Sequence, residues 1–311
     1  MTVDVIIPVY KPDEKLLTII NRLESQSVAP MRICLMNTEE KYWENFLRGK
    51  NSDVLGKSTE VKHVSLWEFD HGATRNEGAK GSTADFLLFM TQDAIPEDDT
   101  LIEKLCRCFD NPKVGAAYAR QIATDSAPLS EQFSRKFNYP DISSVKSLKD
   151  KDALGIKTYF CSNACAMYKR ETYEKLGRFP VNMIFNEDMV FAHKLIENGY
   201  EIAYEADAKV IHFHNYSDIQ QFKRNFDLAV SQAMHPEVFE GVSSESEGIK
   251  YVGKAFSYFK DCGKPLYFIP FTVTCAFRLI GFKLGKNYTK LSHRQVLRFT
   301  DSPRFFKKMW S

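Results

Sequence analysis

The sequence predicts an α/β protein in which helices flank a mostly parallel central sheet, followed by a basic helical extension. Two observations carry this prediction: short apolar runs alternate with helix-like segments through roughly the first 120 residues, and the last sixty or so residues are strongly basic. The 311-residue chain is 44% hydrophobic and 26% charged, which gives enough apolar surface for one large domain or two smaller ones.

Each element of the sheet has its own signal. Five apolar runs bounded by turn residues predict strands, at residues 3–9, 31–36, 61–67, 85–91 and 114–119. Apolar spacing predicts a helix over 13–26, and a proline followed by acidic residues predicts another over 96–110. Ligands bind at the carboxyl ends of parallel strands, so one rim should carry the following residues: Pro8 to Tyr10, Asn37, Asp70 to Asn76 and Thr91 to Asp93.

The loop after the first strand argues against a dinucleotide-binding site and against a P-loop. It reads "PVYKPDEK", without a G-x-G-x-x-G or G-x-x-x-x-G-K-[ST] pattern. The charge of a phosphorylated ligand must then be met by a metal, by basic side chains or by helix N-termini. The apolar run "ADFLLFM" stops before Gln92 and Asp93, which makes Asp93 the natural metal ligand. The alternative is that Asp93 caps the helix expected after Pro96.

Two further polar groups come later in the chain. Glu187 and Asp188 open a predicted helix, where acidic residues are also favoured simply by the helix dipole. His212 and His214 alternate along a predicted strand and should share a face. Such a pair can ligate a metal, although two histidines on a half-buried strand can equally be structural.

Cysteines and the N-terminus bear on the compartment. The seven cysteines are scattered and form no paired C-x-x-C sets, which is typical of reduced thiols rather than of a zinc site or a disulfide framework. Cys161 and Cys165 lack the neighbours that a nucleophile or metal site would need. The first residues do not resemble a signal peptide, so we expect a cytoplasmic protein.

The C-terminal region differs in charge from the rest. Residues 250–311 hold thirteen Lys and Arg against two acidic residues, a net charge of +11 that leaves −9 for residues 1–249. Residues 265–285 are nearly all apolar, but Pro270, Arg278 and Lys283 interrupt them, so the segment falls short of a membrane span. It suits a helix lying in the interface over anionic lipid. The alternative is a helix that packs in a core or forms a dimer.

Three segments together resemble a known family. "VIIPVYKPDEKLLTIINRLESQS", "HGATRNEGAKGSTADFLLFMTQDAIP" and "NEDMVFAHKLIENGYEIAYEADAKVIHFH" follow the order and spacing of family 2 glycosyltransferases with the GT-A fold. "FDHGATRN" with "TQDA" is similar to the bacterial rhamnosyltransferase branch, including enzymes of streptococcal rhamnose polysaccharides. The resemblance covers roughly residues 3–235. It implies a glycosyltransferase domain over 1–240, with a donor half to about 120 and an acceptor half after it, and a C-terminal region over 241–311.

The resemblance implies a role for each motif residue around the donor. The residues implied to contact the nucleotide are Pro8, Tyr10, Asn37, Arg75, Asn76, Thr91, Gln92 and Arg224. Asn37 stands where many members have an Asp, and Thr91 replaces the first Asp of the D-x-D motif. Asp93 matches the last Asp, which coordinates the Mn²⁺ or Mg²⁺ that bridges the donor diphosphate. One histidine is implied as a further ligand, His212 ahead of His214. For Arg224, a solvated helix face is the alternative reading.

The same resemblance implies the reacting groups. Asp188 matches the general base that takes a proton from the acceptor hydroxyl, and Glu187 supports it. His71 belongs to the rhamnosyltransferase-like signature and either touches the sugar or packs its loop. Ser162 and Asn163 fall in a loop that members place beside the acceptor.

These implications combine into one expected function. We expect metal-dependent, inverting transfer of L-rhamnose from dTDP-β-L-rhamnose to a hydroxyl of a lipid-linked saccharide, giving an α-linkage in a cell-surface polysaccharide. The enzyme should be peripheral on the inner face of the membrane, without a nucleic-acid partner, and a homo-oligomer is left open. Two alternatives stand beside it: transfer from another nucleotide sugar such as a UDP-hexose, and a catalytically silent saccharide- or lipid-binding scaffold.

Overall fold

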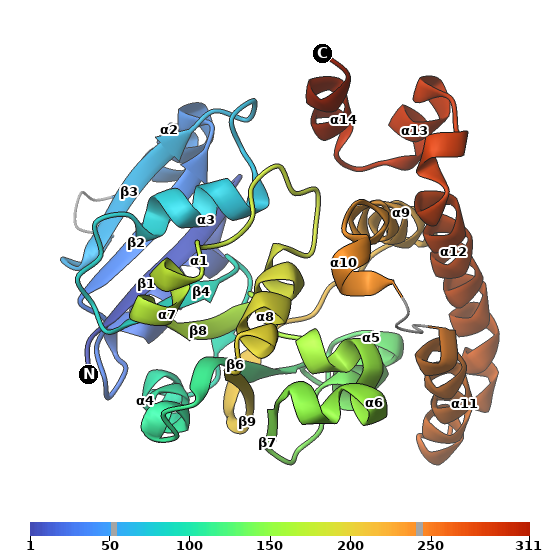
Figure 1. Cartoon of the computed structure of the whole chain (residues 1–311), viewed down its shortest axis with the longest axis horizontal. Coiled ribbons are helices and arrows are strands. Elements are labelled where there is room, and N and C mark those ends of the chain that lie inside the picture. Colours follow the sequence, from blue (N-terminus) through green and yellow to red (C-terminus); the bar gives the residue numbers. More distant parts are fainter. Residues whose placement is uncertain (51–54, 241–244) are drawn as a thin grey trace.

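The computed structural model describes residues 1–50, 55–240 and 245–311, and its centre is a mixed sheet (Figure 1). Within the described residues the sheet has nine strands, ordered β3-β2-β1-β4-β8-β6-β9-β5 with β7 on β9. Four of them run parallel: β1 (Val3–Tyr10), β2 (Arg32–Thr38), β3 (Thr59–Val64) and β4 (Phe86–Met90).

The second half of the sheet contains the antiparallel pairs. Strand β8 (Cys165–Lys169) runs antiparallel between β4 and β6 (Val114–Ile122), and β6 pairs in parallel with β9 (Glu201–Ile211). The short strands β5 (Ile95–Pro96) and β7 (Ser144–Lys146) both run antiparallel to β9. The predicted α/β class is confirmed, with β8 as the strand that makes the sheet mixed.

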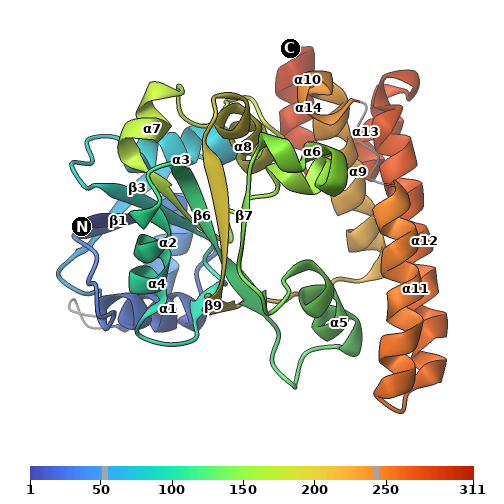
Figure 2. The ribbon, with the colours of Figure 1, turned by 60° about the horizontal axis from the view of Figure 1, so that its bottom comes forward.

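Helices bury both faces of this sheet. Helices α1 (Glu14–Glu24), α2 (Glu40–Leu47) and α4 (Leu101–Arg107) share one core with the strand residues that point toward them. On the other face lie α3 (His71–Ala79), α7 (Arg170–Lys175) and α8 (Glu187–Glu197), and in Figure 2 these three run along the side opposite α1. Shorter helices complete this part: α5 (Leu129–Asn138), α6 (Lys151–Leu154) and α10 (Pro236–Phe239). Burial on both faces explains why the strands are almost continuously apolar.

Two predicted boundaries are wrong, each for a local reason. Strand β3 ends at Val64 rather than at residue 67, because the backbone N–H and hydroxyl of Ser65 both bond to the Glu68 carboxylate in a tight turn. The helix predicted from Pro96 begins at Leu101, since Pro96 pairs with Val210 in β5. Asp93 therefore does not cap that helix. Strand β8 was not predicted; helix α7 follows it directly from Arg170.

The C-terminal region is helical, as predicted, and packs along α9 (Asp218–Met234) (Figures 1 and 2). Its helices are α11 (Glu245–Asp261), α12 (Phe268–Lys286), α13 (His293–Phe299) and α14 (Pro303–Trp310). A Cβ on Gly281 of α12 would lie 2.2 Å from the Phe222 carbonyl oxygen, and one on Gly285 would lie 2.3 Å from that of Phe226. Glycine at these two positions is therefore required for α12 to approach α9 so closely.

Helix α12 is more continuous than the sequence suggests. Pro270 does not interrupt it, because the proline falls in the first turn, where a backbone N–H has no intrahelical partner to lose. The 22-residue segment Pro265–Lys286 is long and apolar enough to cross a membrane, and 11% of its most apolar window is buried. Length and composition alone therefore do not exclude a span.

The last helices share a core with the sheet-bearing part. Phe306 of α14 and Val296 of α13 are buried together with Ile184, Phe226 and Val230. This cluster fixes α14 against the segment that precedes α8. The division of the chain at residue 240 stays a prediction.

Candidate active site

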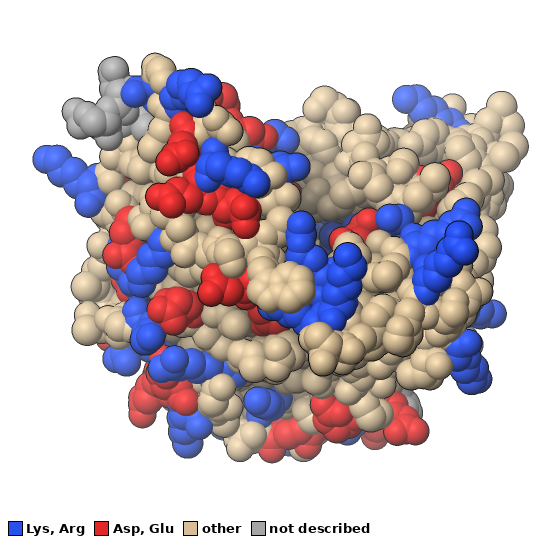
Figure 3. Space-filling view, turned by 90° about the horizontal axis from the view of Figure 1, so that it is seen from above, with Lys and Arg blue, Asp and Glu red and all other residues tan. Residues whose placement is uncertain are grey.

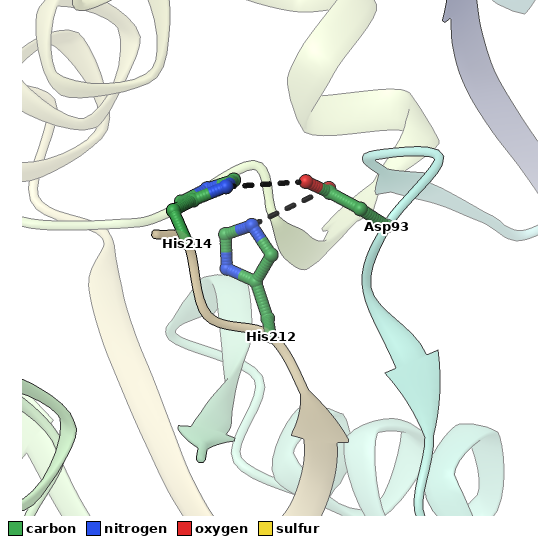
Figure 4. Close-up of side chains that lie close together, drawn as sticks. All are labelled: Asp93, His212 and His214. Carbon is green, nitrogen blue, oxygen red and sulfur yellow. Dashed lines mark ion pairs between the residues drawn. The ribbon is translucent and has the colours of Figure 1, made fainter. Parts of the chain in front are cut away.

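Asp93, His212 and His214 come together at the end of the sheet. Asp93 lies in the loop between β4 and β5, and because Ile95 of β5 pairs with Ile211 of β9, this loop meets the residues that follow β9. His212 Nε2 lies 3.3 Å from Asp93 Oδ1 and His214 Nδ1 lies 3.6 Å from Oδ2 (Figure 4). Both histidines follow the strand rather than lie in it, which corrects the predicted shared strand face.

The surroundings of this cluster keep its carboxylate charged. Burial alone would raise the pKa of Asp93, but the hydrogen bond and the charge of His212 outweigh it and hold that pKa well below its ordinary range. Burial, followed by the charge of His212, lowers the pKa of His214 to about 3. A carboxylate and a neutral imidazole are the forms that ligate metals.

Gln121 of β6 orients His212, and the sequence analysis did not single it out. Its Oε1 lies 2.7 Å from His212 Nδ1 and also accepts from the guanidinium of Arg135. An amide oxygen at Nδ1 requires a proton there. Nε2 is then the nitrogen that donates to Asp93 when the ring is charged and offers its lone pair to a metal when the ring is neutral. The one available signal was its position just past the predicted strand 114–119, at the same rim.

One carboxylate, one Nε2 and one Nδ1 are a donor set that fits a divalent metal. The three ligand atoms lie within 4.8 Å of one another. Mixed nitrogen and oxygen ligands suit a transition-metal ion better than Mg²⁺, which prefers oxygen alone. Of the two predicted ions, Mn²⁺ is therefore the better match to these side chains.

The second chemical element is the pair of carboxylates that opens α8. Asn186 precedes them in a left-handed conformation, with φ of +63°, which asparagine tolerates better than most residues. Glu187 is buried 3.2 Å from the guanidinium of Arg75, and it also accepts from the side-chain amide of Asn163 at 3.3 Å. Glu187 is thereby fixed in place, while Asp188 stays only half buried.

The two carboxylates of this pair have opposite pKa shifts. Burial, followed by the negative charge of Glu187, raises the pKa of Asp188 to about 7. Burial would also raise the pKa of Glu187, but the charge of Arg75 outweighs it and the pKa falls. Asp188 is therefore the member of the pair that exchanges a proton near neutral pH.

A two-residue segment links the two groups. Ser162 Oγ accepts from the Gln121 amide at 2.9 Å, so this hydroxyl is joined to the residue that orients His212. The backbone N–H of Asn163 donates to Asp188 Oδ2 at 3.1 Å, and its side-chain oxygen accepts from Tyr168 at 2.9 Å. The predicted acceptor contacts of Ser162 and Asn163 stay predictions, but both residues position the site.

The residues predicted to contact the nucleotide are spread over the rim. Gln92 exchanges two hydrogen bonds with the backbone of Tyr10, at 2.8 and 2.9 Å, which fixes the loop after β1 beside Asp93. Pro8 lies in β1 opposite Met36 of β2. Asn37 is fully buried, and within the described part of the chain its Oδ1 has no hydrogen-bond partner.

Arg75 and Asn76 have structural partners instead. Besides Glu187, Arg75 donates to the backbone oxygen of His71 at 2.9 Å. Asn76 donates to the Phe179 carbonyl at 2.9 Å and accepts from the hydroxyl of Tyr173. These contacts tie α3 to the segment before α8. A donor contact for either residue stays a prediction.

The remaining predicted residues are His71, Arg224 and Thr91. His71 packs against the rings of Phe69 and Phe185, and burial lowers its pKa. The Arg224 guanidinium stacks 5.1 Å from the centroids of Phe185 and Tyr216, and Tyr216 in turn stacks on His214. Arg224 thus faces the cluster from α9. Thr91 donates its backbone N–H to Ala164 at 3.2 Å.

A cavity of about 730 Å³ adjoins these residues. Tyr10 and His71 line it, together with residues 66–70, residues 181–184 and one face of α14. Asp93, His212, His214 and Asp188 are not among the lining residues. The cavity is therefore a neighbour of the two polar groups rather than the space between them.

Comparison with known proteins identifies the family. The family model described as "Glycosyl transferase family 2" matches residues 4–177, more than half of the chain. The protein belongs to glycosyl transferase family 2. The match ends before Glu187, Asp188 and the two histidines, so their part in the site rests on the geometry described above.

This family 2 glycosyltransferase has curated relatives over most of its length. It is 33% identical to the O-antigen chain rhamnosyltransferase RfbN of Salmonella typhimurium over 100% of this chain and 96% of that one. It is 38% identical to the O-antigen chain rhamnosyltransferase WbaN of Salmonella anatum over 80% and 78%. The resemblance stated from the motifs is thereby confirmed at the level of the family.

Two solved structures show the same fold. The mannosyltransferase PcManGT of Pyrobaculum calidifontis, in complex with GDP-Man and Mn²⁺, matches with a TM-score of 0.60 at 13% identity, covering 93% of this chain and 88% of that one. TarS of S. aureus, in complex with UDP-GlcNAc, matches with a TM-score of 0.50 at 14% identity, covering 93% and 92%. The predicted GT-A fold of this family 2 glycosyltransferase is confirmed.

Proposed function

We propose that this family 2 glycosyltransferase moves L-rhamnose from dTDP-β-L-rhamnose to a hydroxyl of a lipid-linked saccharide in cell-surface polysaccharide synthesis. The similarity to two O-antigen rhamnosyltransferases, at 33% and 38% identity over most of the chain, carries this proposal. The site supports it through a metal-type cluster and a separate proton acceptor, the two groups that an inverting displacement needs.

In this proposal the three-residue cluster holds Mn²⁺. The ion supplies positive charge that stabilises the departing nucleoside diphosphate. Asp93, His212 and His214 are its ligands, Gln121 fixes the His212 ring, and Arg224 lies beside His214, where it can add a positive charge toward the diphosphate.

Asp188 is the general base in this proposal. Two backbone N–H groups fix its carboxylate, from Asn163 at 3.1 Å and Met189 at 2.8 Å, and leave each oxygen a further lone pair. One oxygen takes the proton of the acceptor hydroxyl as that hydroxyl attacks the anomeric carbon from the face opposite the leaving group. The result is inversion and an α-linked rhamnose. Glu187 raises the basicity of Asp188 by its charge.

The donor is tested with purified enzyme, Mn²⁺ and a lipid-linked acceptor. We expect dTDP release from dTDP-rhamnose to be much faster than UDP release from UDP-glucose. Equal rates, or faster release of UDP, would remove the rhamnose assignment while keeping the family mechanism. No release from any nucleotide sugar in a donor screen would favour the scaffold alternative.

We also propose a peripheral position on the cytoplasmic face of the membrane. One face of α12 carries apolar side chains exposed to solvent, namely Ile269, Val273, Ala276 and Ile280. Their spacing of three or four residues places them in one stripe, and basic residues lie at its end, at Lys283 and Lys286. An exposed apolar stripe with a basic end suits an interface over anionic lipid.

Two charged substitutions in the stripe test the proposed membrane position. Val273→Glu with Ile280→Glu should weaken binding to anionic liposomes in a flotation assay. Ile142→Glu, at a more exposed apolar residue outside α12, is the control. Unchanged flotation would contradict the proposal. A dimer that dissociates in the double variant would instead assign the stripe to a second copy of the chain.

A further inference from the structure

The inference concerns the cavity beside the site, and it rests on the proposed function. We propose that this cavity binds the diphosphate and first isoprenoid units of the lipid-linked acceptor, with Arg304 and Lys308 of α14 as the phosphate ligands. From the sequence, the basic C-terminal region is predicted to lie on a membrane or to pack in a core or dimer. The structure places part of it in the wall of a substrate-sized cavity.

Two cations of α14 face the cavity. Arg304 and Lys308 are four residues apart, so they lie on one side of the helix, and both line the cavity. Within residues 1–50, 55–240 and 245–311, neither has a carboxylate within salt-bridge distance; Lys308 lies 5.6 Å from the Trp67 ring centroid. Figure 3 shows this side of the molecule, with Lys and Arg side chains gathered beside a hollow. The charges of Arg304 and Lys308 act on Glu39 and Glu68 without a salt bridge and add to the lowering of the pKa of those carboxyls. Cations at a cavity wall that form no salt bridge favour an anionic ligand.

The wall also carries three carboxylates, Glu68, Asp70 and Asp301, which keep their negative charge, but in the described part of the chain none lies within salt-bridge distance of Arg304 or Lys308. Their oxygens are engaged by other groups. Asp70 accepts from the backbone N–H groups of Ala73 at 2.7 Å and Met183 at 2.9 Å. Glu68 accepts from Ser65. Asp301 pairs with Lys223 at 3.5 Å.

Most of the remaining wall is apolar, which indicates an amphiphilic ligand. Trp67 is 55% exposed, and Val181 and Met309 are also exposed large apolar residues of this wall. At about 730 Å³ the cavity lies in the range of small-ligand sites. A diphosphate attached to an isoprenoid chain combines the charge and the apolar surface that this wall would bind.

Position distinguishes the acceptor from the donor. In the proposed function the donor diphosphate lies at the Asp93 cluster, and no residue of that cluster lines the cavity, although Tyr10, a predicted nucleotide contact, lies at its edge. His71 lines the cavity and packs on Phe185, which directly precedes Asn186 and the carboxylate pair. A diphosphate held at α14 would therefore place the sugar attached to it toward Asp188.

Helix α14 is held firmly enough to serve as a wall. Phe306, on its opposite side, is fully buried among Ile184, Phe226 and Val230. Trp310 stacks on His293 with ring centroids 3.8 Å apart. The cations are thus fixed relative to the catalytic part of the chain.

Calorimetric binding of farnesyl diphosphate tests this without requiring turnover. Arg304→Ala with Lys308→Ala should weaken its binding on the order of tenfold or more, while Lys307→Ala, on the same helix but outside the cavity, should leave it unchanged. Binding of dTDP with Mn²⁺ should stay the same in all variants. Lys308→Glu should weaken the binding of farnesyl diphosphate further. Matching melting temperatures would show that each variant is folded.

Three results would overturn the inference. They are wild-type protein that does not bind farnesyl diphosphate, equal affinity in the wild type and the double variant, and weakened dTDP binding with farnesyl diphosphate unaffected. The last would assign the two cations to the donor. Because the probe contains no sugar and no nucleotide, failure of the rhamnose assignment would leave this test intact.

Discussion

Asp93 and Asp188 are the same kind of residue in two environments that act in opposite directions. Two histidines adjoin Asp93 and hold its pKa low, whereas burial and the neighbouring Glu187 raise the pKa of Asp188 to about 7. The difference supports the proposed roles, since a permanent anion suits a metal ligand and a group that titrates near neutrality suits proton transfer. Substitutions at the two positions should therefore fail in different ways.

The largest effect should come from Asp188→Asn. An amide of the same shape cannot accept the proton, so kcat should fall about 10²- to 10⁴-fold, the usual contribution of a general base. Binding of dTDP with Mn²⁺, measured by calorimetry, should not change. Asp207→Asn, at an exposed carboxylate of β9, is the control. Turnover close to wild type would remove Asp188 from the mechanism.

Asp93→Asn should lose activity because it binds the metal more weakly. Losing the one carboxylate of the cluster should lower Mn²⁺ affinity and reduce activity about 100-fold or more, because the ion supplies several kcal/mol of charge stabilisation. Excess Mn²⁺ should restore part of this loss, which it cannot do for Asp188→Asn. The exposed Asp99→Asn serves as a nearby control. If Mn²⁺ rescued both catalytic variants equally, the contrast between the two sites would be wrong.

A smaller effect is expected at Gln121, which acts on the cluster through His212. Gln121→Met removes the acceptor for Nδ1–H and should lower Mn²⁺ affinity about 10- to 100-fold, as is usual for groups that orient a metal-ligating histidine. Gln121→Glu keeps an acceptor and should retain most of the affinity. Titration followed by Mn²⁺ electron paramagnetic resonance measures both. Equal losses in the two variants would point to packing rather than to the hydrogen bond.

The pH profile sharpens the comparison on the wild-type enzyme. A general base must be unprotonated, and the raised pKa of Asp188 means that protonation begins at about pH 7 as the pH falls. Below this value kcat/KM should fall about tenfold per pH unit. Donor binding should not follow the same curve, since Asp93 remains charged there. A profile that is flat from about pH 8 to 5 would contradict the shift.

Much of this architecture was readable from the sequence, and the failures have local causes. The alternation of apolar runs and helical spacing predicts the α/β sheet, and the polar residues that follow its fourth apolar run predict Asp93 at the rim. Strand β8 was missed because its small residues, such as Cys165 and Ala166, carry little strand signal although they are buried between two other strands. Gln121 and Arg135 were missed because their role depends on pairing between distant segments.

The close packing of α12 on α9 has a geometric consequence. Arg224, which lies beside His214, belongs to α9. Gly281 and Gly285 allow α12 to pack closely against this same helix. A membrane surface bound by the exposed stripe of α12 would therefore lie at a fixed distance from the reacting groups. Under the proposed membrane position, the distance from the membrane surface to Asp188 would be constant. The length of the acceptor saccharide would then decide which of its sugars reaches Asp188.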